Sequence, residues 1–299
     1  WAIPYTPPGA RAPDRVLVAM ADDTMWMAQA DGLVPLAWAD VPALSMDAGF
    51  MGGRGRVQLT AGEGEVWQAE VDLERRVITA GAHGFAAAHF PGPRLTGPAG
   101  TEDELYILAD EYSSELGAHN GFLVRYFLSG TPGGTLFYFP PGPENRPVNP
   151  GDVAYVGPDE AVALWPYSTE RVVRFKDGGA AEETVPGVQQ LEHVSGWGTV
   201  ASTGSGRFFL HRGGVGPWRE VAVWPEGVRL LSAGEAAAWG VDDADALLQL
   251  VPGEGLCPDP PTVELEARAV VAIRGAVVVL GVAQNGVNTT MTQWFWLEP

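Results

Sequence analysis

The sequence predicts an all-β fold in which about seven copies of one antiparallel sheet module follow each other along the chain. The 299 residues include 39 glycines and 25 prolines, which are dispersed between short apolar runs without a low-complexity period. Hydrophobic residues make up 46% of the chain and charged residues 18%, a composition that can form a sizeable core. Turn residues at such frequent intervals are typical of many short strands rather than of long helices.

The module is an apolar strand, a short Gly/Asp/Glu turn, a second strand that often contains Trp, a further turn and a third strand. Three copies without Trp begin near Leu105, Thr199 and Ala269. The starts are on average about 42 residues apart, as expected for a sheet of four strands, although the interval from Thr199 to Val228 is only 29. Four copies contain a Trp that follows the leading valine after 10 to 12 residues: Val16–Trp26, Val57–Trp67, Val153–Trp165 and Val228–Trp239.

This repeated pattern of strands and turns resembles the sequences of the β-propeller superfamily, in particular those of bacterial seven-bladed proteins with degenerate repeats. The resemblance covers about residues 15–299 and implies a seven-bladed β-propeller of four-stranded antiparallel blades. The scaffold is WD40-like, but the Trp-Asp dipeptide that closes each WD40 repeat is missing, so no functional residue is carried over. A two-sheet β-sandwich is the structural alternative because it also has short strands at regular spacing. A sandwich has no reason to repeat a Trp at a fixed offset.

We expect a single domain over residues 1–299, in which residues 1–14 form a Pro-rich N-terminal segment. The aromatic segment 291–299 is predicted to close the ring by completing either the first or the last blade, which removes exposed end repeats. The apolar run Ala269–Val282 is interrupted by Arg274 and Gly275 and predicts a strand pair. The Ala-rich segment 234–250 contains Gly240 and an acidic turn, so it predicts a hairpin rather than a helix.

The charge balance excludes several classes of partner. The net charge is −19, which repels phosphate backbones and anionic headgroups, so neither nucleic acid nor a membrane surface is expected as a partner. No apolar run reaches the ~20 residues that span a bilayer. The single cysteine, Cys257, cannot form an internal disulfide. The Pro-rich start at Trp1 suits an exported protein, so an extracellular or periplasmic location is expected, with a cytoplasmic location as the alternative.

Motifs that identify common enzyme and metal sites are missing from the sequence. It contains no His-Glu-x-x-His, no Walker loop, no Gly-x-Ser-x-Gly and no Cys-x-x-Cys. The five histidines have no spacing typical of a metal site, so we expect neither a metal nor a cofactor. Acidic pairs such as Asp159-Glu160 fall in predicted turns. Asp242-Asp243-x-Asp245 has some character of a calcium loop, but it lacks the downstream Gly and Glu of an EF-hand, and an ordinary acidic turn is expected.

The third module departs most from the repeat, because a polar insertion follows its first strand. Long polar loops on a rigid scaffold are frequent binding sites. The insertion covers residues 110–121 and is followed by the apolar segment 122–126. The candidate binding residues are Asp110, Glu111, Tyr112, His119 and Asn120 of the insertion, together with Arg125 of the segment that follows it.

These observations favour a non-enzymatic binding or scaffolding protein that presents one loop face to a protein or glycan partner. One alternative is a hydrolase or lyase with a carboxylate and histidine site at the central channel. A second alternative is a structural subunit of a surface or appendage assembly. The identity of the partner and the oligomeric state do not follow from the sequence.

Overall fold

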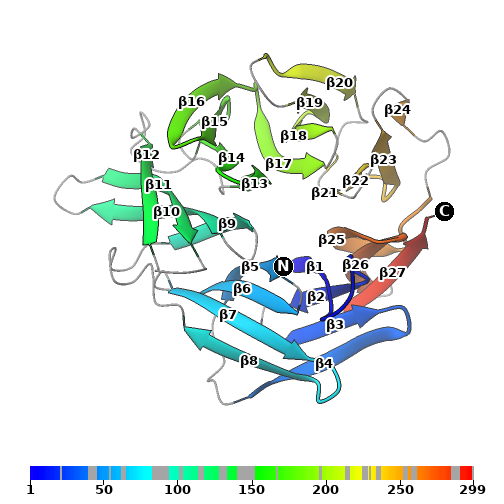
Figure 1. Cartoon of the computed structure of the whole chain (residues 1–299). Helices are drawn as coiled ribbons and strands as arrows, with labels where there is room; N and C mark the ends of the chain where they lie inside the picture. Colours follow the sequence, from blue (N-terminus) through cyan, green and yellow to red (C-terminus); the bar gives the residue numbers. More distant parts are fainter. Residues whose placement is uncertain are drawn as a thin grey trace.

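The described part of the chain consists of β-strands and their connections. A computed structural model places 27 strands in six sheets, and no helix occurs among the described residues, so the all-β prediction is confirmed (Figure 1). Within the same residues no helix is long and apolar enough to cross a membrane. The structure describes residues 1–20, 22–39, 46–53, 55–61, 65–82, 94–100, 104–113, 118–127, 133–139, 152–165, 168–194, 197–212, 216–223, 228, 230–233, 237–251, 255–256, 261–283 and 290–297.

The N-terminal sheet has eight strands and contains two consecutive four-stranded antiparallel meanders. A parallel pair between β4 and β8 joins the outer strands of the two meanders. The strands are β1 (Ala2–Tyr5), β2 (Arg15–Ala19), β3 (Met25–Gln29), β4 (Gly32–Ala39), β5 (Met46–Gly53), β6 (Arg56–Ala61), β7 (Glu65–Asp72) and β8 (Val77–Ala82).

Three four-stranded sheets follow, and in each of them every strand pairs with the next strand along the chain. The first contains β9 (Arg94–Gly100), β10 (Glu104–Ser113), β11 (Ala118–Phe127) and β12 (Gly133–Phe139). The second contains β13 (Val153–Gly157), β14 (Glu160–Leu164), β15 (Arg171–Lys176) and β16 (Gly179–Thr184). The third contains β17 (Val188–Val194), β18 (Gly198–Thr203), β19 (Arg207–His211) and β20 (Arg219–Val223).

Two C-terminal sheets complete the described structure. Both predicted strand pairs lie here and are confirmed: β22–β23 within the Ala-rich segment, and β25–β26 across Arg274 and Gly275. Gly275 has a φ of 72°, which favours glycine in the turn. The strands are β21 (Leu230–Ala233), β22 (Ala238–Val241), β23 (Leu247–Val251) and β24 (Gly255–Leu256), then β25 (Leu265–Ile273), β26 (Ala276–Ala283) and β27 (Thr290–Trp296).

The sheets follow one another around a common centre, and the first strand of each meander lies innermost (Figure 1). Each innermost strand contacts the next, in the order β1, β5, β9, β13, β17, β21 and β25, and β25 contacts β1 again. Apolar side chains fill the space between neighbouring sheets. For example, Val162 and Val172 of one sheet pack with Leu191 and Phe209 of the next. Burying each such side chain contributes roughly 1.5–3 kcal/mol.

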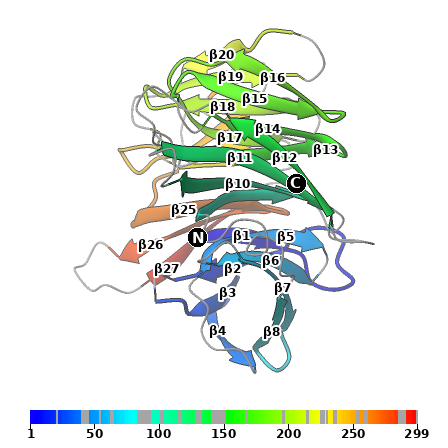
Figure 2. The ribbon, with the colours of Figure 1, turned by 90° about the vertical axis from the view of Figure 1, so that its left-hand side faces the viewer.

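The last sheet and the first meet at a seam, where they lie against each other in both views (Figures 1 and 2). Val16 and Val18 pack there against Val271 and Val278, and the Arg274 N–H donates to the Pro13 carbonyl at 2.9 Å. β27 pairs with β26, and β1 pairs with β2. Among the described strands, none is shared between the two sheets, and the seam is held by this side-chain packing and by the backbone hydrogen bond.

The predicted start residues of the modules do not mark the same strand in every sheet, so the predicted repeat boundaries are wrong. The predicted starts at residues 16, 57, 105 and 199 lie on the second strand of their meander. The other three lie at the first strand: residue 153 begins β13, residue 228 precedes β21, and residue 269 lies within β25. This shift explains the short interval of 29 residues. Strands of such a meander are apolar on both faces, so composition alone does not distinguish the first strand from the second.

The recurring Trp likewise does not mark one structural position. Trp26 and Trp67 lie on third strands, β3 and β7, whereas Trp239 lies on the second strand β22 and Trp165 directly follows the second strand β14. Trp165 and Trp239 are buried, but Trp26 and Trp67 are only partly buried. The constant offset therefore arose from comparing non-equivalent strands.

Candidate functional site

The predicted polar insertion of the third module is largely a continuation of two strands. Residues 110–113 extend β10 and residues 118–121 extend β11, with Tyr112 opposite His119 and Glu111 opposite Asn120. The expectation of a long loop is therefore wrong, because backbone pairing continues through residues whose side chains are polar. The side chains of Asp110, Glu111, Tyr112, His119 and Asn120 lie outside the described part of the structure.

Arg125 lies at the other end of the same hairpin. It is opposite Tyr106, six residue pairs from the Tyr112–His119 pair, which corresponds to about 20 Å along the strands. The structure therefore does not bring Arg125 together with the other predicted binding residues.

Arg125 instead takes part in a polar network between two sheets. Glu104 is buried and accepts hydrogen bonds from Nε and Nη2 of Arg125 at 2.8 and 2.6 Å. The hydroxyl of Tyr155 and the backbone N–H of Asp159 donate to the second Glu104 oxygen, each at 3.2 Å. The Asp159 carboxylate also forms an ion pair with Arg125. These bonds connect β10 and β11 to the β13–β14 hairpin.

A second polar network centres on Arg174 of β15, which is only 6% exposed. Its Nη1 donates to Glu160 at 2.8 Å and its Nε donates to Glu183 at 2.9 Å. Burial alone would raise the pKa of Glu160, but hydrogen bonds from Lys176 and Arg174 outweigh it and hold the pKa below its usual value. The indole N–H of Trp218, from the neighbouring sheet, donates to Glu183 at 2.6 Å.

Two histidines of the neighbouring sheet border this network. Nε2 of His211 lies 2.8 Å from the carbonyl oxygen of Gly216, and its ring lies beside Trp218 with the centroids 5.4 Å apart. Burial lowers the pKa of His193, so the ring is neutral near pH 7. Within the described residues, neither Nδ1 of His193 nor Nη2 of Arg174 has a hydrogen-bond partner, and both atoms are buried.

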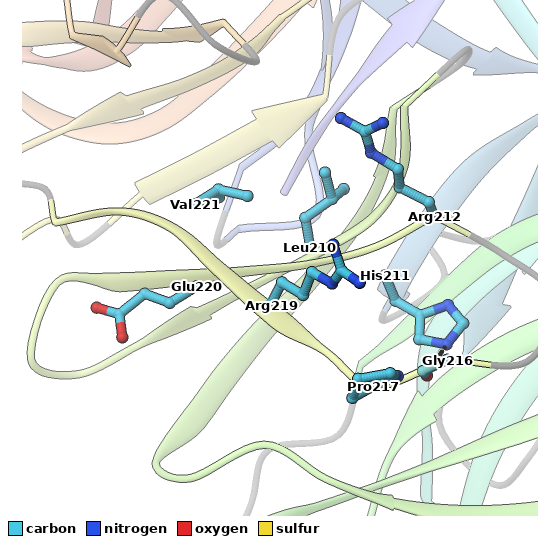
Figure 3. A pocket seen from close by; sticks show the side chains of 8 residues that line it. All are labelled: Leu210, His211, Arg212, Gly216, Pro217, Arg219, Glu220 and Val221. Atoms are coloured by element: carbon cyan, nitrogen blue, oxygen red, sulfur yellow. Dashed lines mark hydrogen bonds between the residues drawn. The ribbon is translucent and has the colours of Figure 1, made fainter.

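A cavity of about 440 Å³ opens next to His211, between the end of β19 and β20 (Figure 3). This volume lies in the range of small-molecule and side-chain binding sites. The cavity is lined by Leu210, His211, Arg212, Gly216, Pro217, Arg219, Glu220 and Val221.

Two arginines give this cavity its chemical character. Arg212 directly follows β19 and Arg219 is the first residue of β20, and both are exposed. Neither forms a hydrogen bond or an ion pair with any part of the chain that the structure describes. Glu220, in contrast, forms an ion pair with Arg207, in which Oε2 of Glu220 lies 2.6 Å from Nη2 of Arg207. Two guanidinium groups at one cavity, both without a partner among the described residues, can bind a carboxylate or a phosphate through forked hydrogen bonds.

No motif in the sequence indicates this cavity, because the Gly-Gly-Val-Gly segment 213–216 has the composition of an ordinary Gly-rich turn. The available signal was the pair of arginines on either side of that turn, in a chain with 37 acidic and 18 basic residues. Their convergence depends on the pairing of β19 with β20. That pairing joins Leu210 to Arg219 and becomes visible only in the sheet.

Among the described residues, no group of three or more His, Cys, Asp or Glu side chains could hold a metal ion. His83, His89 and Cys257 lie outside the described residues. The segment with calcium-loop character is an ordinary acidic turn, as expected. Oδ1 of Asp242 accepts hydrogen bonds from the backbone N–H groups of Ala244 and Ala246, at 2.9 and 2.8 Å.

Comparison with known proteins identifies the fold but no family. No protein-family model and no curated protein matches the sequence. Solved structures do match. The β-propeller domain of Cps50 (Swd1) from Myceliophteria thermophila has a TM-score of 0.61 at 10% identity, over 97% of this chain and 94% of that chain. BamB from Moraxella catarrhalis has a TM-score of 0.52 at 10% identity, over 95% and 80% of the two chains.

A third similar structure is PorZ, a bacterial surface component of the type-IX secretion system of Porphyromonas gingivalis. It matches with a TM-score of 0.59 at 10% identity over 99% of this chain. This chain spans only 38% of the length of PorZ. At this level of identity the matches bear on the fold alone, and they confirm the predicted β-propeller architecture.

Proposed function

From its β-propeller fold, we propose that this chain is a non-enzymatic binding or scaffolding protein. The cavity between β19 and β20 would hold an acidic group of a protein partner. The single observation that carries the proposal is the presence of Arg212 and Arg219, both without a partner among the described residues, at one cavity. Arginine is enriched at protein interfaces because its fork matches a carboxylate and its stem covers apolar surface.

The proposal includes a seven-bladed ring over residues 1–299. It is supported by the closed circuit of contacts among β1, β5, β9, β13, β17, β21 and β25. In this arrangement β1–β4 and β5–β8 are two blades whose outer strands pair. The last blade would contain β25–β27, so that segment 291–299 completes it.

The acidity of the chain increases the selectivity of the cavity. With a net charge of −19, most of the surface repels an acidic partner. A cavity lined by two arginines is then a local exception, so a partner carboxylate is favoured there over other positions. Each forked arginine–carboxylate contact in such a setting is worth about 1–3 kcal/mol.

The proposal is tested by titrating the full chain with a fluorescently labelled octapeptide of glutamate and glycine and measuring fluorescence anisotropy. The double variant Arg212→Gln, Arg219→Gln should bind this peptide at least about tenfold more weakly than the wild type. The matched control is Arg56→Gln, Arg75→Gln. It changes the net charge equally, but at exposed arginines that already have partners, Glu70 and Asp72.

Equal loss of affinity in both double variants would show that only net charge matters and would contradict the proposal. Binding of a uronic-acid oligosaccharide in preference to the peptide would assign the cavity to a glycan and contradict a protein ligand. The candidate residues Asp110, Glu111, Tyr112, His119 and Asn120 remain a second proposed contact surface. Their alanine variants should weaken binding of the natural partner but leave binding of the glutamate peptide unchanged.

The extracellular or periplasmic location stays a prediction, which fractionation of cells expressing the native gene would test. The two functional alternatives, a hydrolase or lyase and an assembly subunit, also stay predictions. No observation on the described residues favours either of them over binding.

A further inference from the structure

Among the described strands, the sheet that begins with β25 has one strand fewer than the four-stranded sheets. It contains β25, β26 and β27, whereas the sheets beginning with β9, β13, β17 and β21 each contain four strands. β27 is therefore the outer strand of this sheet. Among the described strands, only β26 pairs with it.

The register shows which backbone groups of β27 point away from β26. The N–H of Leu297 donates to the carbonyl of Gly275 at 2.9 Å, so Leu297 and every second residue before it point toward β26. The intervening residues therefore direct both N–H and C=O to the outer edge. They are Thr290, Thr292, Trp294 and Trp296.

This edge lacks the devices that usually prevent strand addition. Charges, prolines, bulges and short length protect natural sheet edges, but β27 is seven residues long and contains neither charge nor proline nor glycine. Outer strand β16 contains two glutamates, β20 contains Arg219 and Glu220, and β24 has only two residues. β4 and β8 protect each other by pairing.

Besides β27, β12 is the one outer strand of the described sheets that is uncharged, longer than two residues and unpaired at its outer edge, and its aromatic side chains are engaged. Phe137 and Phe139 lie against Phe175 of the next sheet, with centroid distances of 4.6 and 6.1 Å. On β27, Trp294 and Phe295 pack against neighbouring apolar clusters, but Trp296 is 65% exposed and Met291 is 44% exposed. Trp296 stacks on Trp294, with centroids 5.5 Å apart and planes inclined by 26°.

We propose that the outer edge of β27 binds an extended, positively charged segment of a partner protein, which adds to the sheet as its fourth strand. Main-chain hydrogen bonds to the four outward residues would provide affinity, and the Trp294–Trp296 stack would contact side chains of the added strand. The net charge of −19 attracts a cationic segment and disfavours a second copy of this chain. This surface is separate from the arginine cavity and does not depend on it.

The test uses the full chain and an acetylated, amidated nonapeptide, Lys-Val-Thr-Val-Lys-Val-Thr-Val-Lys. Binding is measured by Trp fluorescence, and amide hydrogen exchange is measured by NMR. The peptide should slow exchange at the N–H groups of Thr292, Trp294 and Trp296. The same peptide with glutamate in place of lysine should bind at least about tenfold more weakly.

Thr292→Pro removes one outward N–H without removing a hydrogen bond to β26, so it should weaken binding of the lysine peptide at least about tenfold. Thr292→Ala keeps the N–H and should bind within about twofold of the wild type. Thr292→Lys provides a second variant that keeps the backbone donor but repels the cationic peptide, and it should also weaken binding. Arg212→Gln, Arg219→Gln should leave binding of this peptide unchanged, which separates this proposal from that for the cavity.

Equal affinity of the proline and alanine variants would overturn the proposal, since strand pairing would then not be involved. Protection of the same amides by raising the protein concentration alone, together with a doubled mass in solution, would assign the edge to a second copy and overturn the cationic partner.

Discussion

Asp159, at the end of a tight turn, and Glu160, the first residue of β14, are neighbours in the chain, yet their carboxylates belong to different polar networks. Asp159 has a φ of 60° and forms an ion pair with Arg125 of the preceding sheet. Glu160 forms an ion pair with Arg174 of its own sheet. The acidic pair therefore connects three consecutive sheets, because Arg174 also binds Glu183, which accepts the indole N–H of Trp218 from the following sheet.

Removing these two charges should have different effects on stability. Glu160→Gln should lower the free energy of unfolding by about 3 kcal/mol, because it removes a negative charge that compensates the buried guanidinium of Arg174. Asp159→Asn should lower it by less than about 1 kcal/mol, because the Asp159 side chain is 51% exposed and water replaces the lost interaction. Urea unfolding followed by Trp fluorescence measures both. Equal losses would contradict the assignment of Glu160 as the buried partner.

Asp152 should make the folded state less stable as the pH rises from about 4 to 6. Burial raises the pKa of Asp152 from 3.8 to about 6, although the N–H groups of Val153 and Leu191, which donate to it, act in the opposite direction. In this window the folded chain holds a proton that the unfolded chain has lost, so the stabilisation present below pH 4 is lost as the pH rises, by roughly 3 kcal/mol at most.

The measurement is the urea midpoint of wild type and Asp152→Asn at pH 4, 5, 6 and 7. As the pH rises, the urea midpoint of the wild type should fall relative to that of Asp152→Asn. A difference that is constant with pH would show that Asp152 does not titrate in this window.

His193 should have the opposite dependence on pH. Burial lowers its pKa from 6.5, so below pH 6.5 the unfolded chain binds a proton before the folded chain does. The stability contribution of neutral His193 is present above pH 6.5 and is lost as the pH falls through the folded-state pKa. His193→Gln should abolish this loss, which thermal unfolding between pH 5 and 8 would detect. A variant as acid-sensitive as the wild type would exclude His193 as the titrating group.

Gly198 should be essential for the geometry beside the cavity. It has a φ of 127°, and a Cβ atom placed on it would collide with the carbonyl oxygen of His211. Gly198→Ala should therefore lower the free energy of unfolding by more than about 2 kcal/mol and displace the end of β19. Gly157→Ala is the matched control, because a Cβ there meets nothing within 4 Å. Similar stabilities of the two variants in urea would disprove the steric argument.

The sequence by itself determined the all-β class, the β22–β23 and β25–β26 hairpins and the acidic turn at Asp242. These features depend on short-range properties, namely strand-forming side chains, glycine in a left-handed turn and an Asp that binds its own backbone. The polar side chains of residues 110–121 were misinterpreted as a loop because a strand pair can continue through polar residues when its neighbour is in register.

Only the tertiary structure decided on which strand each recurring Trp lies, that Arg125 lies far from His119, and that Arg212 and Arg219 share a cavity. It also decided that β27 is the outer strand of a three-stranded sheet. All these relationships depend on the register between strands and on the stacking of sheets. Both are set by the packing of side chains that are distant in the sequence, so no local pattern of residues specifies them.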